Sequence, residues 1–158
     1  VDLYRQYLPR IHSYVRLRVE DEAVAQDLTA EVIERAVSRQ HTLRRKEAFG
    51  AWLFAIARNA VAGYYRRRRP TVSLDKAGHQ SAPEPLPPEV VIRREEVARL
   101  KTALEILSDR EQEILRLKFG GGLGNKEIGD IMSLQPGNVA VIVYRALRKL
   151  RAEMEGES

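Results

Sequence analysis

The stretch "WLFAIARNAVAGYYRRRRP", from Trp52 to Pro70, begins with the pattern of a buried helix and ends in four consecutive arginines. Its apolar side chains recur at steps of three and four residues, which places them on one face of a helix. They are Leu53, Ile56, Ala57, Ala60, Val61 and Tyr64. A helix that only filled a core would need neither the polar residues of the opposite face nor the basic end.

That opposite face carries a cation, an amide, an aromatic ring and a small side chain, on Arg58, Asn59, Ala62, Tyr65 and Arg66. Such a set suits single-stranded nucleic acid, because arginine binds phosphate, a ring stacks on bases and an amide reads a base edge. The alternative is a solvated helix face with extended arginines. The arginine run itself says nothing about sequence specificity.

The rest of the chain repeats the helical spacing and has no useful run of period two, so the predicted class is all-α. One stripe comprises Tyr4, Tyr7, Leu8, Ile11 and Val15; a second comprises Leu28, Val32, Ile33, Ala36 and Val37; a later one comprises Val97, Leu100, Leu104 and Leu107. Ser108 and Glu111 then have the spacing of a capping box, and Ile114, Leu115 and Phe119 follow on the next helix.

Five prolines interrupt this pattern between Pro70 and Pro88. We expect an extended linker over residues 70–95 that joins two small helical domains, residues 1–69 and 96–158. The alternative is a long surface loop within one domain, but structureless loops of this length are uncommon. A linker of this kind offers little to fix the two domains against each other, so we expect each to be compact by itself.

The composition favours an acidic partner. The net charge is +5, and residues 1–69 hold fourteen Lys and Arg against eight Asp and Glu. No cysteine is present, which excludes disulfides and thiolate metal sites. No apolar run approaches the roughly 20 residues that cross a bilayer, and no signal peptide is visible. Because the chain begins with Val1 rather than Met, we expect that residues of the natural N-terminus are missing.

The C-terminal part has the pattern of a helix-turn-helix. We expect Asn125 to cap a short helix, Ser133 to Gln135 to form a turn, and Pro136 to open a longer helix with a basic end. Gly129 leaves room where the two helices cross. Inward positions of the longer helix are Val139, Val143, Ala146, Leu147 and Leu150. The alternative is an ordinary helical hairpin.

Other motifs argue against catalysis. The glycines of "FGGGLG", from Phe119 to Gly124, are not followed by the lysine and hydroxyl of a phosphate loop, so they indicate a flexible connection. His12, His41 and His79 have no metal-ligand spacing, and no nucleophile–base pair is suggested. We therefore expect no enzyme activity, no cofactor and no metal.

The order of these segments resembles the extracytoplasmic-function sigma factors of bacterial RNA polymerase. The resemblance rests on "FGAWLFAIARNAVAGYYRRRR", the proline-rich linker and "LSDREQEILRLKFGGGLGNKEIGDIM" together, and covers nearly the whole chain. It implies a region 2 domain that captures unpaired bases of the minus-ten promoter element, and a region 4 domain that reads the minus-thirty-five element. It also implies cytoplasmic promoter-specific initiation with core RNA polymerase and promoter DNA as partners, an anti-sigma factor as regulator, and no membrane insertion.

The resemblance assigns residues to these roles. For the minus-ten element they are Leu43, Arg44, Arg45, Lys46, Trp52, Arg58, Asn59, Tyr65, Arg66, Arg67, Arg68 and Arg69. For the minus-thirty-five element they are Asn125, Lys126, Gly137, Asn138, Ala140, Val141, Tyr144, Arg145, Arg148 and Lys149. Core polymerase would bind an acidic ridge of Asp27, Glu31 and Glu34, whose spacing puts them on one helical face. The alternative for that ridge is a solvated face.

One segment departs from the family pattern. Ala140, Val141 and Ile142 stand where the recognition helix usually carries polar side chains. These residues can contact thymine methyls but cannot read guanine, which predicts an A·T-rich or weakly defined minus-thirty-five element. The same apolar patch would also suit a protein partner. The main alternative function is a helix-turn-helix regulator or adaptor that does not initiate transcription; an output domain of the response-regulator type would need a receiver domain that the sequence lacks.

Overall fold

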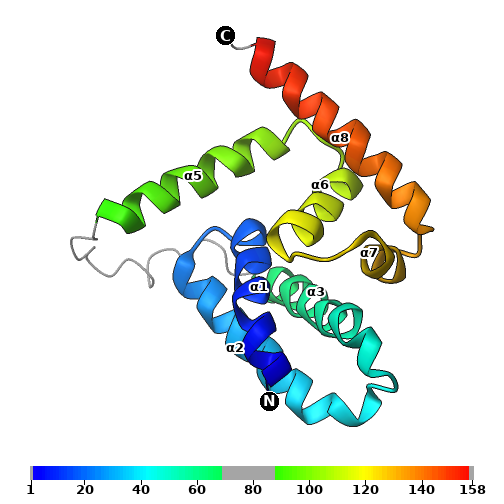
Figure 1. Cartoon of the computed structure of the whole chain (residues 1–158). Coiled ribbons are helices and arrows are strands. Elements are labelled where there is room, and N and C mark those ends of the chain that lie inside the picture. The colour runs from blue at the N-terminus through cyan, green and yellow to red at the C-terminus, as the bar shows by residue number, and fades with distance from the viewer. Residues whose placement is uncertain (1, 69–87, 157–158) are drawn as a thin grey trace.

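The computed structural model describes residues 2–68 and 88–156, and these residues form helices without any β-strand among them (Figure 1). The predicted all-α class is confirmed. The first unit holds α1 (Asp2–Arg18), α2 (Glu22–Arg39), two short turns η1 (Gln40–Thr42) and η2 (Lys46–Ala48), and α3 (Phe49–Arg68). None of the helices in the described ranges is both long and apolar enough to cross a bilayer.

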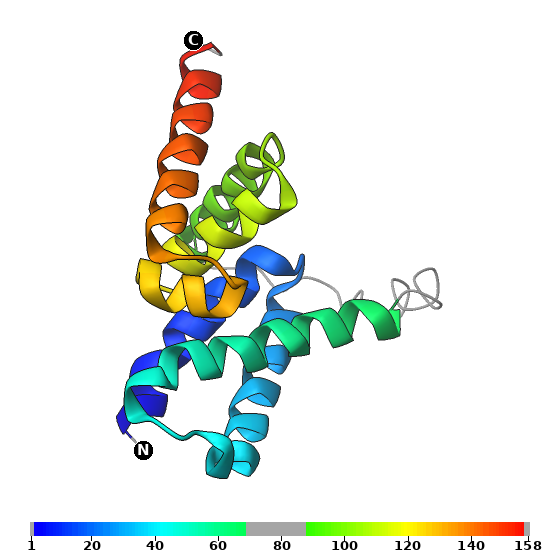
Figure 2. The same ribbon diagram turned by 90° about the vertical axis from the view of Figure 1, so that its right-hand side faces the viewer.

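The second unit begins with α5 (Pro88–Leu104), followed by α6 (Asp109–Leu115) and the π-turn η4 (Arg116–Gly120). The helix-turn-helix then comprises α7 (Asn125–Met132) and α8 (Pro136–Gly156), and α8 extends away from the body of the molecule (Figure 2). The predicted linker is therefore wrong over residues 88–95, which are helical. A proline is tolerated in the first turn of a helix, because its missing N–H would have had no partner there. Most of the predicted linker lies outside the described residues.

The core follows the predicted stripes with identifiable exceptions. The apolar face of α3 is buried, and Ile11, Val15, Leu28 and Val32 pack against it. Leu8, Val37, Leu100 and Leu147 were predicted to point inward but are 42–49% exposed, and Phe119 is 61% exposed. Tyr14, which the pattern missed, is fully buried and meets Phe54 edge to face at 5.7 Å.

Local signals for the helix ends are partly correct. Ser108 and Glu111 form the predicted capping box, with Glu111 N donating to Ser108 Oγ at 3.1 Å and Ser108 N to Glu111 Oε1 at 3.0 Å. Asn125 is not the cap of α7, because Gly124 holds that position and its N–H binds the Glu127 side chain at 3.1 Å. Ser133 adopts the left-handed conformation in the predicted turn.

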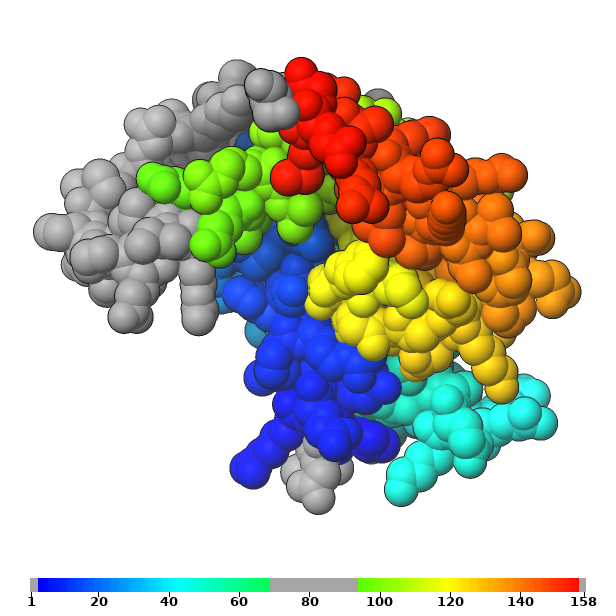
Figure 3. All heavy atoms as spheres, turned by 45° about the horizontal axis from the view of Figure 1, so that its top comes forward, coloured from blue at the N-terminus to red at the C-terminus, as the bar shows by residue number. Residues whose placement is uncertain are grey.

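The two units lie against each other, contrary to the predicted independence of the domains. The η4 turn packs on α1, and α7 packs on α3 (Figures 2 and 3). In Figure 3 the atoms of α6 and η4 lie directly beside those of α1. We call this the closed arrangement. It is held by contacts between the surfaces of the two units, which the linker sequence does not reveal.

The glycine segment supplies part of that complementarity and is not the flexible connection predicted from the sequence. Arg10 Nε donates to the carbonyl of Gly121 at 2.7 Å, and its Nη2 donates to Gly122 O at 2.9 Å. A methyl group on Gly121 would stand 2.7 Å from Phe54 Cε1. The missing side chain therefore lets the segment approach the first unit closely.

Candidate nucleic-acid interface

The outer face of α3 presents part of the predicted strand-reading set. Asn59 is exposed one turn after the exposed Ala55, and nothing in the described residues buries it. Tyr65 is 41% exposed, but its hydroxyl donates to the carbonyl of Arg18. Asn59 is thus available to a base edge, whereas the phenol of Tyr65 is held against α1.

The segment before α3 holds Leu43 to Lys46, which the resemblance assigns to the minus-ten element. Arg44, Arg45 and Lys46 are exposed there, and Leu43 is half-buried against the core. Trp52 is half-buried, packs on Phe49 at 5.7 Å between ring centroids, and donates from Nε1 to Thr42 Oγ1 at 3.0 Å. Trp52 therefore anchors the loop to α3, a positioning role that the sequence did not indicate.

The basic end of α3 is largely open to solvent. Arg66 and Arg67 are exposed, and Arg68 donates to the hydroxyl of Tyr64. Arg69 lies outside the described residues. A cluster of this kind attracts phosphates at long range, with an effect that salt weakens.

The acidic ridge on α2 is only partly as predicted. Asp27 and Glu34 are exposed, whereas Glu31 is half-buried and pairs with Arg35 at 3.3 Å. Two free carboxylates on one helical face remain available to a basic partner, and the third is partly neutralised within α2.

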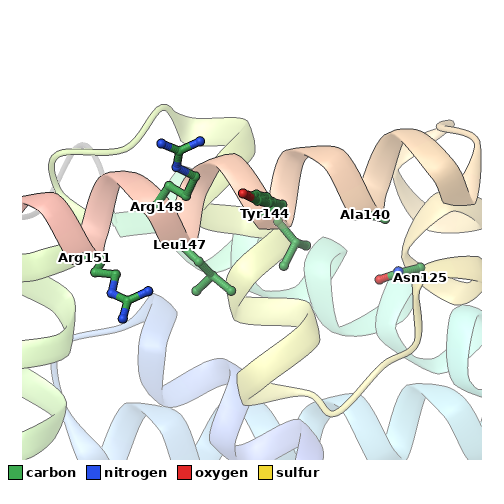
Figure 4. A pocket seen from close by; sticks show the side chains of 7 residues that line it. Asn125, Ala140, Tyr144, Leu147, Arg148 and Arg151 are labelled. Atoms are coloured by element: carbon green, nitrogen blue, oxygen red, sulfur yellow. The ribbon is translucent and has the colours of Figure 1, made fainter.

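The outer face of α8 carries most of the predicted duplex-reading set. Its exposed residues are Gly137, Asn138, Ala140, Val141, Tyr144, Arg145, Arg148 and Lys149. Val141 and Tyr144 are 46% and 54% exposed, so the predicted apolar patch is present at the surface. Figure 4 shows Tyr144, Leu147, Arg148 and Arg151 along one side of this helix, at the edge of a shallow cavity of about 460 Å³ that also includes Asn125.

Some members of that set are engaged within the protein. Lys149 Nζ lies 2.9 Å from Glu111 Oε2, and this hydrogen bond leads the contacts that lower the pKa of Glu111. Asn125 Oδ1 accepts a hydrogen bond from Lys118 Nζ at 3.0 Å, while Lys126 is exposed. Lys149 therefore clamps α8 to the start of α6.

A buried carboxylate joins the two units and also holds Arg58, one of the predicted strand-reading residues. Glu113 of α6 is 5% exposed. Its Oε2 accepts from Tyr14 Oη at 2.6 Å and from Arg58 Nε at 2.8 Å, and its Oε1 accepts from Arg18 Nη1 at 3.1 Å. Arg116, one turn further along the second unit, also lies 3.1 Å from Oε1.

These contacts set the charge state of the cluster. Burial alone would raise the pKa of Glu113, but the charge of Arg18 and the hydrogen bond from Tyr14 lead the groups that outweigh it, and the pKa is lowered. Burial and the neighbouring carboxylate raise the pKa of the Tyr14 phenol well above its ordinary range. Burial lowers the pKa of Arg18, but Tyr14 and Glu113 more than compensate and raise it. The cluster is thus a carboxylate held by two cations and a neutral phenol from the first unit.

Sequence reasoning missed this cluster. Tyr14 follows Ile11 by three residues and could have been added to the first stripe. Glu113 precedes the buried Leu117 by four residues, which gives it an inward position on its helix. No local pattern identified its partners, because they lie in a different unit and 55–99 residues earlier in the chain.

The comparison with known sequences decides the family. The family of sigma-70 region 2 matches residues 3–71, and that of sigma-70 region 4 matches residues 103–152. The ECF RNA polymerase sigma factor ShbA of Streptomyces griseus is 32% identical over 156 residues, which cover 96% of this chain and 79% of ShbA. The chain belongs to the ECF sigma factors. The resemblance that the sequence motifs indicated is confirmed, with region 2 in the first unit and region 4 in the second.

Two further ECF sigma factors extend the comparison. BldN of Streptomyces coelicolor is 34% identical over 151 residues. The aligned residues cover 94% of this chain but only 57% of BldN. SigM of Bacillus subtilis is 28% identical over 153 residues, covering 96% of this chain and 92% of SigM. Similarity therefore runs through both regions rather than through the helix-turn-helix alone.

Solved structures support the fold. CnrH, in its complex with the cytosolic domain of CnrY, gives a TM-score of 0.71 at 21% identity, over 99% of this chain and 88% of CnrH. The sigma factor RpoE of Bartonella quintana, in complex with the anti-sigma factor NepR, gives a TM-score of 0.67 at 22% identity, over 98% of each chain. Both structural alignments extend over the two units of this sigma factor.

Proposed function

We propose that this sigma factor binds core RNA polymerase and directs transcription initiation at specific promoters. The observation that carries the proposal is the pairing, in one chain of the ECF family, of region 2 with region 4. Region 2 offers an exposed amide and a basic helix end, and region 4 offers a helix-turn-helix with an open outer face. A regulator or adaptor that does not initiate transcription would not need region 2.

Region 2 would read the separated strand of the minus-ten element. Asn59 and the loop residues Arg44 and Arg45 are exposed on its surface, with the arginines of α3 beyond them. Extracting a base from the stack costs a few kcal/mol, so a site that recovers this cost selects sequences that melt easily. Tyr65 would join this set once its hydroxyl leaves the Arg18 carbonyl.

Region 4 would place α8 in the major groove at the minus-thirty-five element. Asn138 is its exposed amide near the start of α8, and the neighbouring Ala140 and Val141 can meet only apolar groups of the bases. Arg145 and Arg148 would contact phosphates. This assignment predicts an A·T-rich or weakly defined element.

The remaining surfaces would serve proteins. Asp27 and Glu34, with Glu31 behind them, would dock on a basic surface of core polymerase. A groove of about 660 Å³ between α1, α5, η4 and α8, lined by Leu100, Phe119 and other apolar side chains, would suit an anti-sigma factor. Acting with polymerase, the protein would work in the cytoplasm and would carry out no catalytic step of its own.

Transcription from purified components tests the proposal. The protein is mixed with core polymerase and a library of genomic DNA fragments, and the start sites are mapped. Transcripts that begin at a shared pair of upstream elements, and that disappear when the protein is omitted, support it. Binding to DNA without such transcripts would favour the regulator that does not initiate transcription.

A further inference from the structure

We propose that Tyr14, Arg18 and Arg58 form a phosphate-binding site of region 2, which the Glu113 carboxylate of region 4 fills in the closed arrangement and a DNA backbone phosphate fills when the regions separate. The inference rests on the proposed function for the identity of the ligand. Nothing in the family match assigns Tyr14 or Arg18 to DNA.

The geometry of the site is that of an oxyanion cradle. Three donors of region 2 converge on a single carboxylate: a phenol at 2.6 Å, one guanidinium at 2.8 Å and another at 3.1 Å. Arg18 Nη1 also donates to Tyr14 Oη at 2.9 Å, which orients the phenol toward the anion. A third cation, Arg116, belongs to region 4 and leaves together with Glu113.

The chemistry of these donors fits a phosphate as well as a carboxylate. Guanidinium groups bind both anions through paired N–H donors, and a neutral phenol adds one more. Without an anion, the site would hold two neighbouring cations that are only partly exposed, with side-chain exposures of 22% for Arg18 and 35% for Arg58. Like charges at such a place favour occupation by an anion, whichever source supplies it.

The position of the site favours DNA over an acidic protein segment. Arg58 is adjacent to Asn59 on α3, and the same helix ends in the exposed Arg66 and Arg67. A strand bound at Asn59 that runs along α3 to its basic end would begin beside Arg58. The whole of residues 1–69 carries the positive excess of the chain, which attracts a polyanion.

The same site cannot hold both anions, so closure and strand binding exclude each other. In the closed arrangement Arg58 is occupied by the Glu113 carboxylate of region 4. The apparent affinity for single-stranded DNA is then reduced by the fraction of molecules that are open. Weakening the Glu113 contact should raise that fraction.

The first experiment measures the separation of the regions in the full chain. The 158 residues contain no cysteine, so two exposed alanines, Ala30 of α2 and Ala152 of α8, can be replaced by cysteine and labelled for energy transfer. Glu113→Gln should increase the distance between the dyes. Glu105→Gln, which changes the net charge equally at an exposed position of region 4, should leave it unchanged.

The second experiment measures binding of a fluorescent single-stranded oligonucleotide. Glu113→Gln should tighten binding roughly tenfold by removing the competing anion and its charged hydrogen bonds, and Glu105→Gln less than twofold. In the Glu113→Gln background, Arg18→Ala should then weaken binding severalfold and reduce the slope of log K against log salt by about 0.7. Arg5→Ala, an exposed arginine of α1, should leave the slope unchanged.

The outcomes separate the possibilities. Equal affinity of Glu113→Gln and Glu105→Gln for the oligonucleotide overturns the proposal. It is also overturned if, in the Glu113→Gln background, Arg18→Ala changes neither the affinity nor the salt slope. Occupation by polyglutamate in preference to the oligonucleotide would assign the cradle to an acidic protein instead. If Glu113→Gln loses helical content, Glu113→Asp, which keeps the charge but shortens its reach, should open the protein and tighten binding. Failure of the transcription assay would refute the proposed function and leave these results standing.

Discussion

Replacing Gly129 by alanine should destabilise the helix-turn-helix and weaken duplex binding. A Cβ at this position of α7 would lie 2.4 Å from the carbonyl oxygen of Leu134 and 3.4 Å from its carbon. The oxygen belongs to the backbone of the turn, whose N–H at Leu134 donates to Gly129 O at 2.9 Å. The turn must therefore move by about 1 Å to reach an ordinary contact distance, and this hydrogen bond is lost or stretched.

The magnitude follows from these two contacts. Overpacking of this kind costs about 1–3 kcal/mol, and loss of one backbone hydrogen bond adds about 1 kcal/mol. The better helix propensity of alanine returns about 0.5–1 kcal/mol. The free energy of unfolding should thus fall by about 1–3.5 kcal/mol, which lowers the Tm of a chain of this size by roughly 2–14 °C.

Thermal and urea unfolding, followed by circular dichroism, measure the change, and anisotropy measures binding to a duplex. For the unfolding measurement Gly137→Ala is the matched control, since nothing lies within 4 Å of a Cβ at that helical position, and it should be neutral or slightly stabilising. If Gly129→Ala unfolds within about 0.5 kcal/mol of the natural protein and binds duplex equally, the close turn does not constrain α7.

Four further substitutions or conditions address the other surfaces. Asn59→Ala should reduce open-complex formation tenfold or more on a weak promoter without changing affinity for core polymerase, and equal promoter opening would contradict the assignment. Asp27→Lys with Glu31→Lys should weaken core binding in a pull-down, more at low salt than at high salt; unchanged capture by a helical variant would mean that the ridge is only solvated. Val141→Arg should tighten non-specific duplex binding and steepen its salt dependence, and an unchanged slope would place α8 away from the phosphates. The pKa of Glu113 is lowered in the closed arrangement, so its contribution to closure is complete above the ordinary glutamate pKa and is lost as the pH falls through the lowered pKa. The regions should therefore separate in acid. A distance between the two dyes that does not change with pH would refute this.

The sequence predicted features that depend on neighbours along the chain. The buried face of α3, the capping box at Ser108 and the turn after α7 all follow from spacings of two to eight residues, and all are present. The family followed from the order of such segments. The exposed Asn59 and Val141 could be placed because they lie opposite core residues on their own helices.

Features that depend on contact between the two regions could not be predicted. The proline-rich sequence indicated freedom between the regions, but it does not encode whether their surfaces match. Gly121 suggested flexibility because a glycine allows it, whereas here the absent side chain permits contact with Phe54. Glu113 was indistinguishable from a surface glutamate, since its partners Arg18 and Arg58 come from another unit.

Crosslinking within the promoter complex tests the central claim most directly. Ala55 of α3 and Ala140 of α8 are exposed alanines on the two faces assigned to DNA, and each can be replaced singly by cysteine carrying a photoreactive group. With core polymerase at a promoter, the Ala55 position should crosslink to one unpaired strand near the start site, and the Ala140 position to the upstream duplex. Crosslinks from both positions to the same duplex segment, or from Ala140 alone, would contradict the account.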